Sequence, residues 1–228
     1  MKYIIALFSE LYIHLCLIHK NFSCIKSQII LSSIKTSKSC ACHLEGSYLS
    51  LSKMNISGQD NSVKIGKGQI YRCNISVEGK NNSLYIDNGC QIYNSYIRIK
   101  GENCSIIIKH HTSVGNAQII CMGKNTNINI GSCCMIADNV DIWNTDSHPI
   151  YDKASEQLIN SSRTINIGDK VWIGKGVAVL KGVTLGDGSV IGMHSVVTNN
   201  TEPYCIYAGN PAKKIRNDVY WDRSYIRE

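Results

Sequence analysis

His148 lies in the segment NTDSHPIYD, residues 144–152, where a regular pattern in the sequence stops. Before this segment, INIGSCCMIADNVDI carries an aliphatic residue at every sixth position, and after it INIGDKVWIGKGVAVL does the same. A histidine side chain titrates near neutral pH, so it can accept a proton from a hydroxyl group and return one to a leaving group. Loops that leave a rigid scaffold often carry function. His148 is therefore a candidate general base; the alternative is a turn residue before Pro149.

The 11 cysteines form a second group of reactive side chains. None shows C-x-x-C spacing, and CACH at residues 40–43 lacks the second half of a zinc site. Cys133 and Cys134 lie close to the His148 segment, which leaves a thiol nucleophile as an alternative mechanism. Both occupy repeat positions that suit a small apolar side chain, so free thiols in a reducing cytosol are expected. No metal ion is expected.

Internal repeats predict the elements that position these residues. Four stretches align, SGQDNSVKIGKG, EGKNNSLYIDNG, KGENCSIIIKHH and MGKNTNINIGSC, and their glycines are 21, 22 and 22 residues apart. An isoleucine follows each glycine by seven positions: Ile65, Ile86, Ile108 and Ile130. Glycine permits sharp corners, whereas isoleucine requires a packed interior. A period near 20 with these features is typical of a solenoid.

After Ile130 the period shortens to six. One series contains Ile130, Ile136 and Ile142; a second contains Ile167, Ile173, Val179, Leu185, Ile191 and Val197. Three hexads make an 18-residue coil with three flat faces, so the sequence predicts an all-β chain folded as a parallel β-helix. A β-sandwich would need alternation of period two and does not explain this spacing. The periodicity does not give the hand of the helix.

The composition bounds the remaining features. A chain of 228 residues is long enough for one sizeable core. The net charge of +7 is spread over the sequence without a basic run among aromatics, so nucleic-acid binding is not expected. A mildly basic surface favours an anionic cofactor or an acidic polymer. Residues 1–45 are predicted to form an N-terminal extension with an amphipathic helix, too short in its apolar run to span a bilayer, and any membrane association is expected only through it.

At this point the sequence resembles a known family. The tandem IGDKVWIGKGVAVLKGVTLGDGSVIGMHSVV and the later YAGNPAKKIR are similar to left-handed β-helix acyltransferases. NTDSHP, followed by the tryptophan of VWIG, is most similar to the sugar O-acetyltransferase branch, which includes bacterial capsule and polysialic acid O-acetyltransferases. The resemblance implies a left-handed β-helix over residues 46–205 with a catalytic loop at about 143–165. It also implies a cofactor-binding segment and tail over residues 206–228, a homotrimer and acetyl-coenzyme A as acyl donor.

The resemblance also implies roles for single residues. His148 is the expected general base in a direct transfer without an acyl-enzyme, and Trp172 is expected to pack on the pantetheine arm of the cofactor near the thioester. Further cofactor contacts are expected from Lys175, Met193, Thr198, Lys213 and Arg216. Acceptor contacts are expected from Asn144, Asp146 and Asn116.

The sequence thus predicts an acetyl-coenzyme A-dependent O-acetyltransferase that acts on a bacterial surface polysaccharide, with a capsule or sialic-acid polymer as the favoured glycan acceptor. One alternative is a small acceptor, such as a free sugar, the amine of a nucleotide sugar or an antibiotic. The other is a trimeric scaffold without activity, or a metal-dependent relative that needs three converging histidines. The expected location is the cytoplasm, including the inner face of the membrane.

Overall fold

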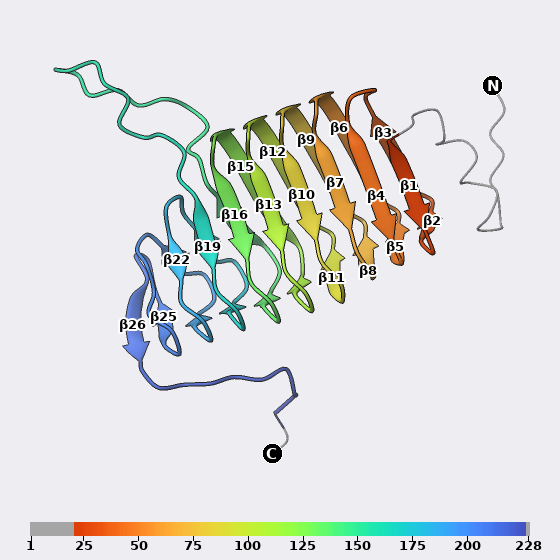
Figure 1. Cartoon of the computed structure of the whole chain (residues 1–228). Coiled ribbons are helices and arrows are strands. Elements are labelled where there is room, and N and C mark those ends of the chain that lie inside the picture. Colours follow the sequence, from red (N-terminus) through yellow and green to blue (C-terminus); the bar gives the residue numbers. More distant parts are fainter. Residues whose placement is uncertain (1–20, 227–228) are drawn as a thin grey trace.

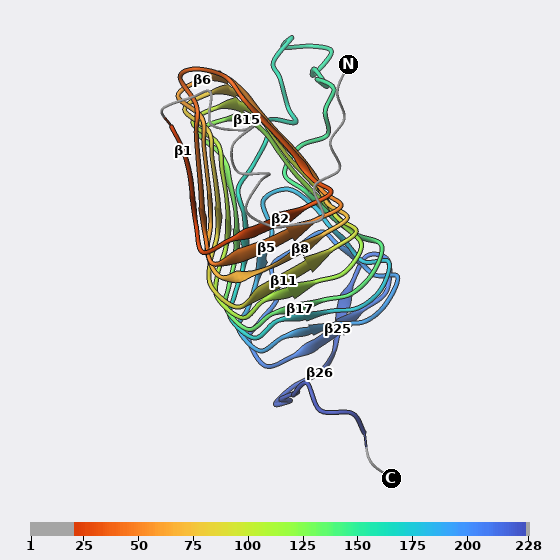
Figure 2. The same ribbon diagram turned by 90° about the vertical axis from the view of Figure 1, so that its right-hand side faces the viewer.

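The computed structural model describes residues 21–226, which form an all-β solenoid without a helix (Figure 1). Each coil contributes one strand to each of three sheets, here called sheets A, B and C, and neighbouring coils pair in parallel. Viewed along the solenoid axis, the coils superpose as a three-sided prism (Figure 2). The prediction of a parallel β-helix is confirmed.

Sheet A has 8 strands, paired in the order in which the coils stack. Its strands are β1 (Phe22–Ile25), β4 (Ala41–Glu45), β7 (Ser62–Ile65), β10 (Ser83–Ile86), β13 (Ser105–Ile108), β16 (Asn127–Ile130), β19 (Ile165–Ile167) and β22 (Thr184–Leu185). The last residues of β7, β10, β13, β16 and β19 are isoleucines in register, and all are 3% exposed or less. The repeat isoleucines therefore form one continuous inner column, which holds the coils together by burial of apolar surface.

Sheet B has 10 strands and ends in an antiparallel pair. Its strands are β2 (Gln28–Ile30), β5 (Ser47–Ser50), β8 (Gly68–Tyr71), β11 (Cys90–Tyr93), β14 (Ser113–Val114), β17 (Met135–Ile136), β20 (Trp172–Ile173), β23 (Val190–Ile191), β25 (Ile206–Ala208) and β26 (Lys213–Arg216). The strands β14, β17, β20 and β23 have two residues each, and the last three of them lie in the hexad region after Ile130. The antiparallel strand β26 covers the last parallel edge of sheet B.

Sheet C has 8 strands, and four of them, of 7 or 8 residues, are the longest strands between residues 21 and 226. Its strands are β3 (Ser33–Thr36), β6 (Lys53–Gln59), β9 (Asn74–Lys80), β12 (Tyr96–Glu102), β15 (Ala117–Lys124), β18 (Val140–Trp143), β21 (Ala178–Val179) and β24 (Val196–Val197). The longer strands account for a repeat of 21 or 22 residues before residue 130 instead of 18.

Glycines form the corner between sheets C and A in the longer coils. Gly58, Gly79 and Gly101 have φ angles of +103°, +111° and +156°. A Cβ atom on Gly79 would lie 2.1 Å from the carbonyl oxygen of Gly101 in the next coil. The aligned glycines of the sequence therefore satisfy both the backbone conformation and the close approach of successive coils.

Buried asparagines stabilise the same corner. The Asn82 amide donates to the carbonyl oxygens of Glu78 and Gly101, at 2.9 and 2.8 Å. Its side-chain oxygen accepts a hydrogen bond from the backbone N–H of Cys104 in the next coil. Asn61 repeats this pattern one coil earlier. These side chains satisfy backbone groups that a corner would otherwise leave unpaired.

The predicted start of the solenoid at residue 46 is wrong, because strands β1 to β4 already lie in the stack. Cys40, Cys42 and Leu44 of this segment are at most 1% exposed. The sequence did not reveal these coils because Cys24 and Cys42 occupy inward positions that carry larger aliphatic residues in the following coils. The predicted amphipathic helix falls largely on residues 1–20, which lie outside the described residues. No helix capable of crossing a bilayer occurs between residues 21 and 226.

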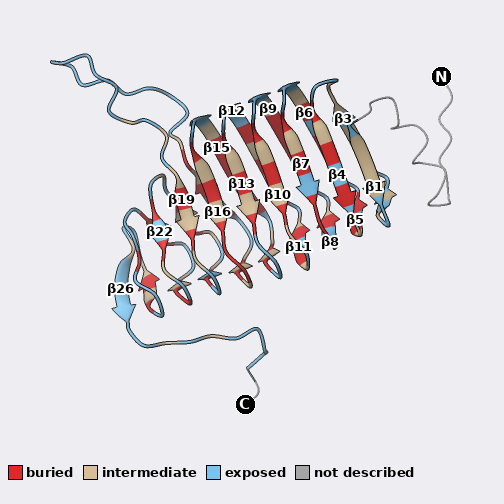
Figure 3. Ribbon diagram, viewed as in Figure 1, coloured by how far each residue is buried: buried red, intermediate tan, exposed pale blue. Residues whose placement is uncertain are grey.

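Two segments leave the prism. Residues 144–164 connect β18 to β19 as a long loop, visible in Figures 1 and 2 beyond the edge of the coils. After β26 the chain runs back along the outside of the stack (Figure 1). Both segments are largely exposed, whereas the inward positions of the strands are buried (Figure 3).

Candidate active site

The loop that carries His148 is a short hairpin. Its two arms meet at an antiparallel bridge between Tyr151 and Leu158, and the N–H of Ile159 donates to the carbonyl oxygen of Ile150 at 2.9 Å. The carboxylate of Asp152 accepts hydrogen bonds from the N–H groups of two residues at its tip. Local hydrogen bonds therefore give the loop a definite shape, although little of it is buried.

His148 lines a cleft of about 380 Å³ at the root of this hairpin. One wall is the end of β15, with Gly123 and Lys124, and the other is the returning arm of the loop, with Asn160 and Ser162. The imidazole is exposed, and within residues 21–226 neither ring nitrogen has a hydrogen-bond partner. Both nitrogens are thus available to a bound molecule.

Asp146 anchors the loop to the body of the solenoid. Its carboxylate accepts hydrogen bonds from Lys181, which also forms an ion pair with it, and from the Asn160 amide at 2.9 Å. The hydrogen bond from Lys181 and then that from Asn160 lower the pKa of Asp146 below its usual value. The same Asn160 amide donates to the carbonyl oxygen of His148 at 2.8 Å. Asp146 was predicted as an acceptor contact; in the free chain it positions the backbone at His148.

Asn144 does not line the cleft, and its predicted role in acceptor binding is wrong. The residue has 0% exposure. Its amide donates to Thr126 Oγ1 at 2.9 Å, and its side-chain oxygen accepts from the N–H of Met122 at 2.7 Å. Its backbone carbonyl oxygen accepts a hydrogen bond from the N–H of Arg163 at 3.0 Å, at the point where the loop returns to the solenoid. Asn144 therefore closes the base of the loop, in the manner of the buried corner asparagines.

A second, more apolar hollow of about 280 Å³ lies on the other side of the loop root. Trp143, Leu180 and the backbone of sheet C line it, together with Asp141. Desolvation raises the pKa of Asp141. Trp143 Nε1 is buried and has no hydrogen-bond partner in the structure. Thr145 lines both this hollow and the His148 cleft, so the two lie next to each other.

Trp172 projects outward from sheet B, as predicted from its place in the hexad, and is 38% exposed. The C-terminal tail reaches it from outside. The ring centroids of Trp172 and Trp221 are 5.9 Å apart at an interplanar angle of 48°. Trp221 Nε1 donates to the carbonyl oxygen of Lys170 at 2.7 Å, and Arg223 donates to Ser113 Oγ at 2.8 Å. The tail thus forms a second aromatic wall beside Trp172.

The other predicted cofactor residues fall into two groups. Lys175 and Met193 follow β20 and β23 at the corner between sheets B and C, and Lys213 and Arg216 lie on β26 at the end of sheet B. All four are exposed and lie near the C-terminal end of the sheet that carries Trp172. Thr198 follows β24 at the other edge of sheet C and is also exposed.

One chain does not bring every predicted residue together. Asn116 precedes β15, whereas the His148 cleft is lined by the last residues of that strand. Eight extended residues span about 26 Å, so Asn116 and His148 lie at opposite edges of sheet C. Trp172 projects from sheet B, which the His148 cleft does not include. A site with all of these residues requires more than one copy of the chain.

Cys134, one of the two cysteines near the loop, does not have the environment of a nucleophile. Cys134 is 0% exposed, and burial raises its pKa to about 11. A reactive thiol needs a lowered pKa and access to substrate. Between residues 21 and 226, no three His, Cys, Asp or Glu side chains converge as metal ligands.

Comparison with known proteins gives a consistent result. The family model for bacterial transferase hexapeptide (six repeats) matches residues 164–199. The polysialic acid O-acetyltransferase of Escherichia coli O1:K1 / APEC is 41% identical over 98 residues, which make up 43% of this chain and 32% of that relative. The chain thus matches about a third of that curated relative's length.

Two solved structures match over most of both chains. The polysialic acid O-acetyltransferase OatWY is 32% identical with a TM-score of 0.70, over 88% of this chain and 92% of that one. The polySia-specific acetyltransferase NeuO is 30% identical with a TM-score of 0.67, over 91% and 92%. A three-sided parallel coil stack that matches these two structures over most of its length defines a left-handed β-helix acyltransferase. The chain belongs to the hexapeptide-repeat acyltransferase family in which OatWY and NeuO fall.

Three residues of the site region escaped the sequence prediction: Asn160, Lys181 and Trp221. Asn160 stands 14 residues from Asp146 on the returning arm of the same loop, whereas Lys181 stands 35 residues away and is brought to Asp146 by the stacking of coils. Trp221 lies in a tail without repeat character, so no local pattern marks its contact with Trp172. Folding, not sequence spacing, creates these contacts.

Proposed function

We propose that this protein is an acetyl-coenzyme A-dependent O-acetyltransferase whose acceptor is a hydroxyl group of a sialic-acid-containing capsule polysaccharide. The observation that carries the proposal is the exposed imidazole of His148, which lines a cleft and is free of protein partners within the described chain. The relatives named for polysialic acid support the acceptor, since they match this chain along most of its length.

In the proposed reaction His148 removes the proton of a sugar hydroxyl while its oxygen attacks the thioester carbonyl. The C–S bond then breaks, and the imidazolium returns the proton to the departing thiolate. General-base catalysis of this kind contributes about 10²–10⁴-fold in rate. The hairpin contributes alignment, because Asn160 holds the carbonyl group of His148 and the Asp146 carboxylate together.

The proposed assembly is a homotrimer in which the His148 cleft of one chain faces the Trp172 wall of another. The separation of these residues within one chain supports this arrangement. Lys213 and Arg216 are exposed cations suited to the cofactor's phosphates. A reducing, cytoplasmic location is proposed because Cys40, Cys90, Cys121 and Cys134 are buried free thiols.

The test is a thiol-release assay with acetyl-coenzyme A and a panel of acceptors: sialic-acid polymers, neutral oligosaccharides and aminoglycosides. His148→Ala is expected to lower kcat with the polymer by about 10²–10⁴-fold. Because the side chain is exposed, the thermal unfolding midpoint is expected to stay unchanged. Activity within tenfold of the unsubstituted protein would falsify the role of His148, and thiol release with aminoglycosides alone would exclude the polymer acceptor.

A further inference from the structure

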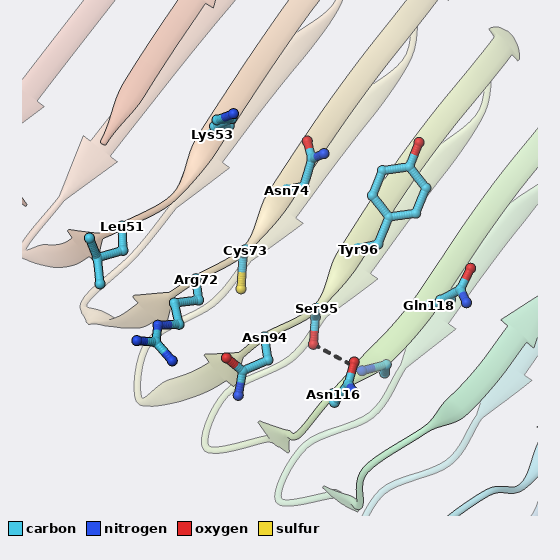
Figure 4. Close-up of a pocket in the computed structure, with 11 residues that line it drawn as sticks. Leu51, Lys53, Arg72, Cys73, Asn74, Asn94, Ser95, Tyr96, Asn116 and Gln118 are labelled. Carbon is cyan, nitrogen blue, oxygen red and sulfur yellow. Dashed lines mark hydrogen bonds between the residues drawn. The ribbon is translucent and has the colours of Figure 1, made fainter. Parts of the chain in front are cut away.

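A second concave surface lies far from His148, along the corner between sheets B and C. It is a groove of about 520 Å³ in the N-terminal half of the solenoid (Figure 4). Four successive coils each place one corner residue in it: Leu51, Arg72, Asn94 and Asn116. Coils in a β-helix stack about 4.8 Å apart, so this row extends about 15 Å along the axis. The groove is therefore elongated and repeats with the coils.

A second row runs parallel to the first, on sheet C. Lys53, Asn74, Tyr96 and Gln118 occupy the same register position on four neighbouring strands. All four side chains line the groove, as Figure 4 shows from the same side as the corner row. Between them the rows present amide groups, one phenol and two cations. Amides both donate and accept hydrogen bonds, and a phenol ring adds an apolar face, a combination suited to sugar rings and their hydroxyls.

Most polar side chains of the groove are available to a ligand; the exceptions are Ser95 and Asn116, which already form hydrogen bonds within the protein. Within the described part of the chain, the side chains of Lys53, Asn74 and Gln118 have no hydrogen-bond partner, and Arg72 contacts only the face of Tyr71, at 5.1 Å. Elsewhere Lys124, Lys181 and Lys214 are each paired with a carboxylate.

No carboxylate lines the groove. The nearest one along the second row is Asp141, one coil beyond Gln118. The end of the groove near Lys53 and Arg72 is thus positive without compensation, which favours an anionic ligand.

We propose that this corner groove binds several consecutive residues of an anionic polysaccharide, extended parallel to the solenoid axis. The inference rests on the proposed function, because it assigns the groove to a remote stretch of the same polymer whose hydroxyl is acetylated near His148. The groove holds the polymer through Lys53 and Arg72 and through hydroxyl contacts with the amide row. A short acceptor that fills only the His148 cleft does not reach it.

The test variant is the double substitution Lys53→Asn and Arg72→Asn. Asparagine is the residue that the next coil places at both equivalent positions, Asn74 and Asn94, and Asn94 shares the φ angle of about 50° with Arg72. The fold is therefore expected to tolerate both changes. The matched control, Lys67→Asn with Lys80→Asn, removes the same charge from exposed lysines outside the groove.

Binding is measured first, without coenzyme, on full-length protein with His148→Ala, using a sialic-acid polymer, a neutral dextran of equal length and double-stranded DNA. The groove variant is expected to raise Kd for the sialic-acid polymer about tenfold, since two surface charge contacts are lost, and the control is expected to leave it unchanged. The proposal is overturned if the groove variant and the parent bind the sialic-acid polymer with equal Kd. It is also overturned if the control variant raises this Kd as much as the groove variant does. The proposal is likewise overturned if the parent binds DNA as tightly as the sialic-acid polymer and the groove variant raises both Kd values equally.

Turnover is measured second, with His148 intact. The groove variant is expected to raise KM for long polymer about tenfold with kcat unchanged, and to leave a short oligosaccharide acceptor unaffected. The inference is overturned if the groove variant raises KM for short acceptors by the same factor as for long polymer. It is also overturned if light scattering shows a changed oligomeric mass, since the surface then has another role. If no variant transfers acetyl groups at all, the proposed function fails while the binding comparison still decides the groove.

Discussion

The hydrogen bonds of Asp146 fix where the loop leaves the coil stack. Lys181 and Asn160 both donate to this carboxylate, and together they lower its pKa. Since the folded-state pKa lies below the unfolded value, the contribution of Asp146 is present above the ordinary aspartate pKa. It is lost as the pH falls through the lowered folded value. The anchor therefore persists at neutral and mildly acidic pH.

Lys181→Met is expected to loosen the loop without unfolding the solenoid. The change removes the cationic donor to Asp146 and keeps an apolar side chain of similar length. Limited proteolysis at neutral pH is the measurement, with trypsin acting at the exposed Lys153 in the hairpin. Cleavage there is expected to accelerate several-fold in the variant and not in Lys80→Met. With pepsin, the difference between variant and parent is expected to disappear in strong acid, once Asp146 is protonated; a difference that persists there contradicts the anchor.

At the scale of the elements, the corner between sheets C and A combines a positive φ angle with a close approach of the next coil, and only glycine meets both conditions. The φ of +111° at Gly79 lies outside the ordinary left-handed region, and the carbonyl of the next coil occupies the place of a Cβ atom. At Gly46, by contrast, φ is +68° and the nearest atom to a Cβ is 3.4 Å away. Substitution of Gly46 therefore tests the cost of the positive φ angle alone, whereas substitution of Gly79 tests this cost together with that of the clash.

Gly79→Ala is expected to lower the free energy of unfolding by about 2–4 kcal/mol, since it adds a clash to a strained φ angle. Gly46→Ala is expected to cost about 1 kcal/mol, the penalty of a left-handed alanine alone. Chemical denaturation followed by circular dichroism measures both. Equal losses at the two positions would show that the approach of Gly79 to Gly101 is not limiting.

The sequence predicted the coils wherever isoleucine or valine recurs in register. It failed at residues 21–45, where the inward Cys24 and Cys42 hide the period. It also failed at Asn144, whose closeness to His148 in the sequence indicated a ligand contact. A buried amide that satisfies Met122 and Thr126 is a property of two coils brought together. His148 could be singled out as a candidate because it interrupts a repeat. Lys181 and Trp221 could not, because they come from another coil and from the C-terminal tail, and Asn160 lies in a loop without a periodic pattern.

At the scale of the whole molecule, His148 and Trp172 occupy different faces of one prism. A transfer site that uses both must combine two chains, and closed rotational symmetry then supplies one such site for each chain. The proposed trimer therefore contains three equivalent sites, each with the loop of one subunit and the tryptophan wall of a neighbour.

Mixed assemblies test this division of labour. His148→Ala and Trp172→Ala are each expected to be poorly active alone. In trimers reassembled from an equal mixture, about one site in four pairs an intact histidine with an intact tryptophan, so about a quarter of the original activity is expected to return. Light scattering confirms the mass of the assemblies. Activity that stays at the level of the separate variants would place both residues in the same chain.

Every coil in the N-terminal half repeats the same cross-section, and each contacts only the coils before and after it. A duplication or loss of one such unit shifts nothing in the hexad region that carries Trp172. The reach of the proposed groove can therefore change in steps of about 4.8 Å, independently of the transfer chemistry. The number of coils would then set the length of glycan that the groove binds, so related chains with more or fewer coils would bind longer or shorter stretches.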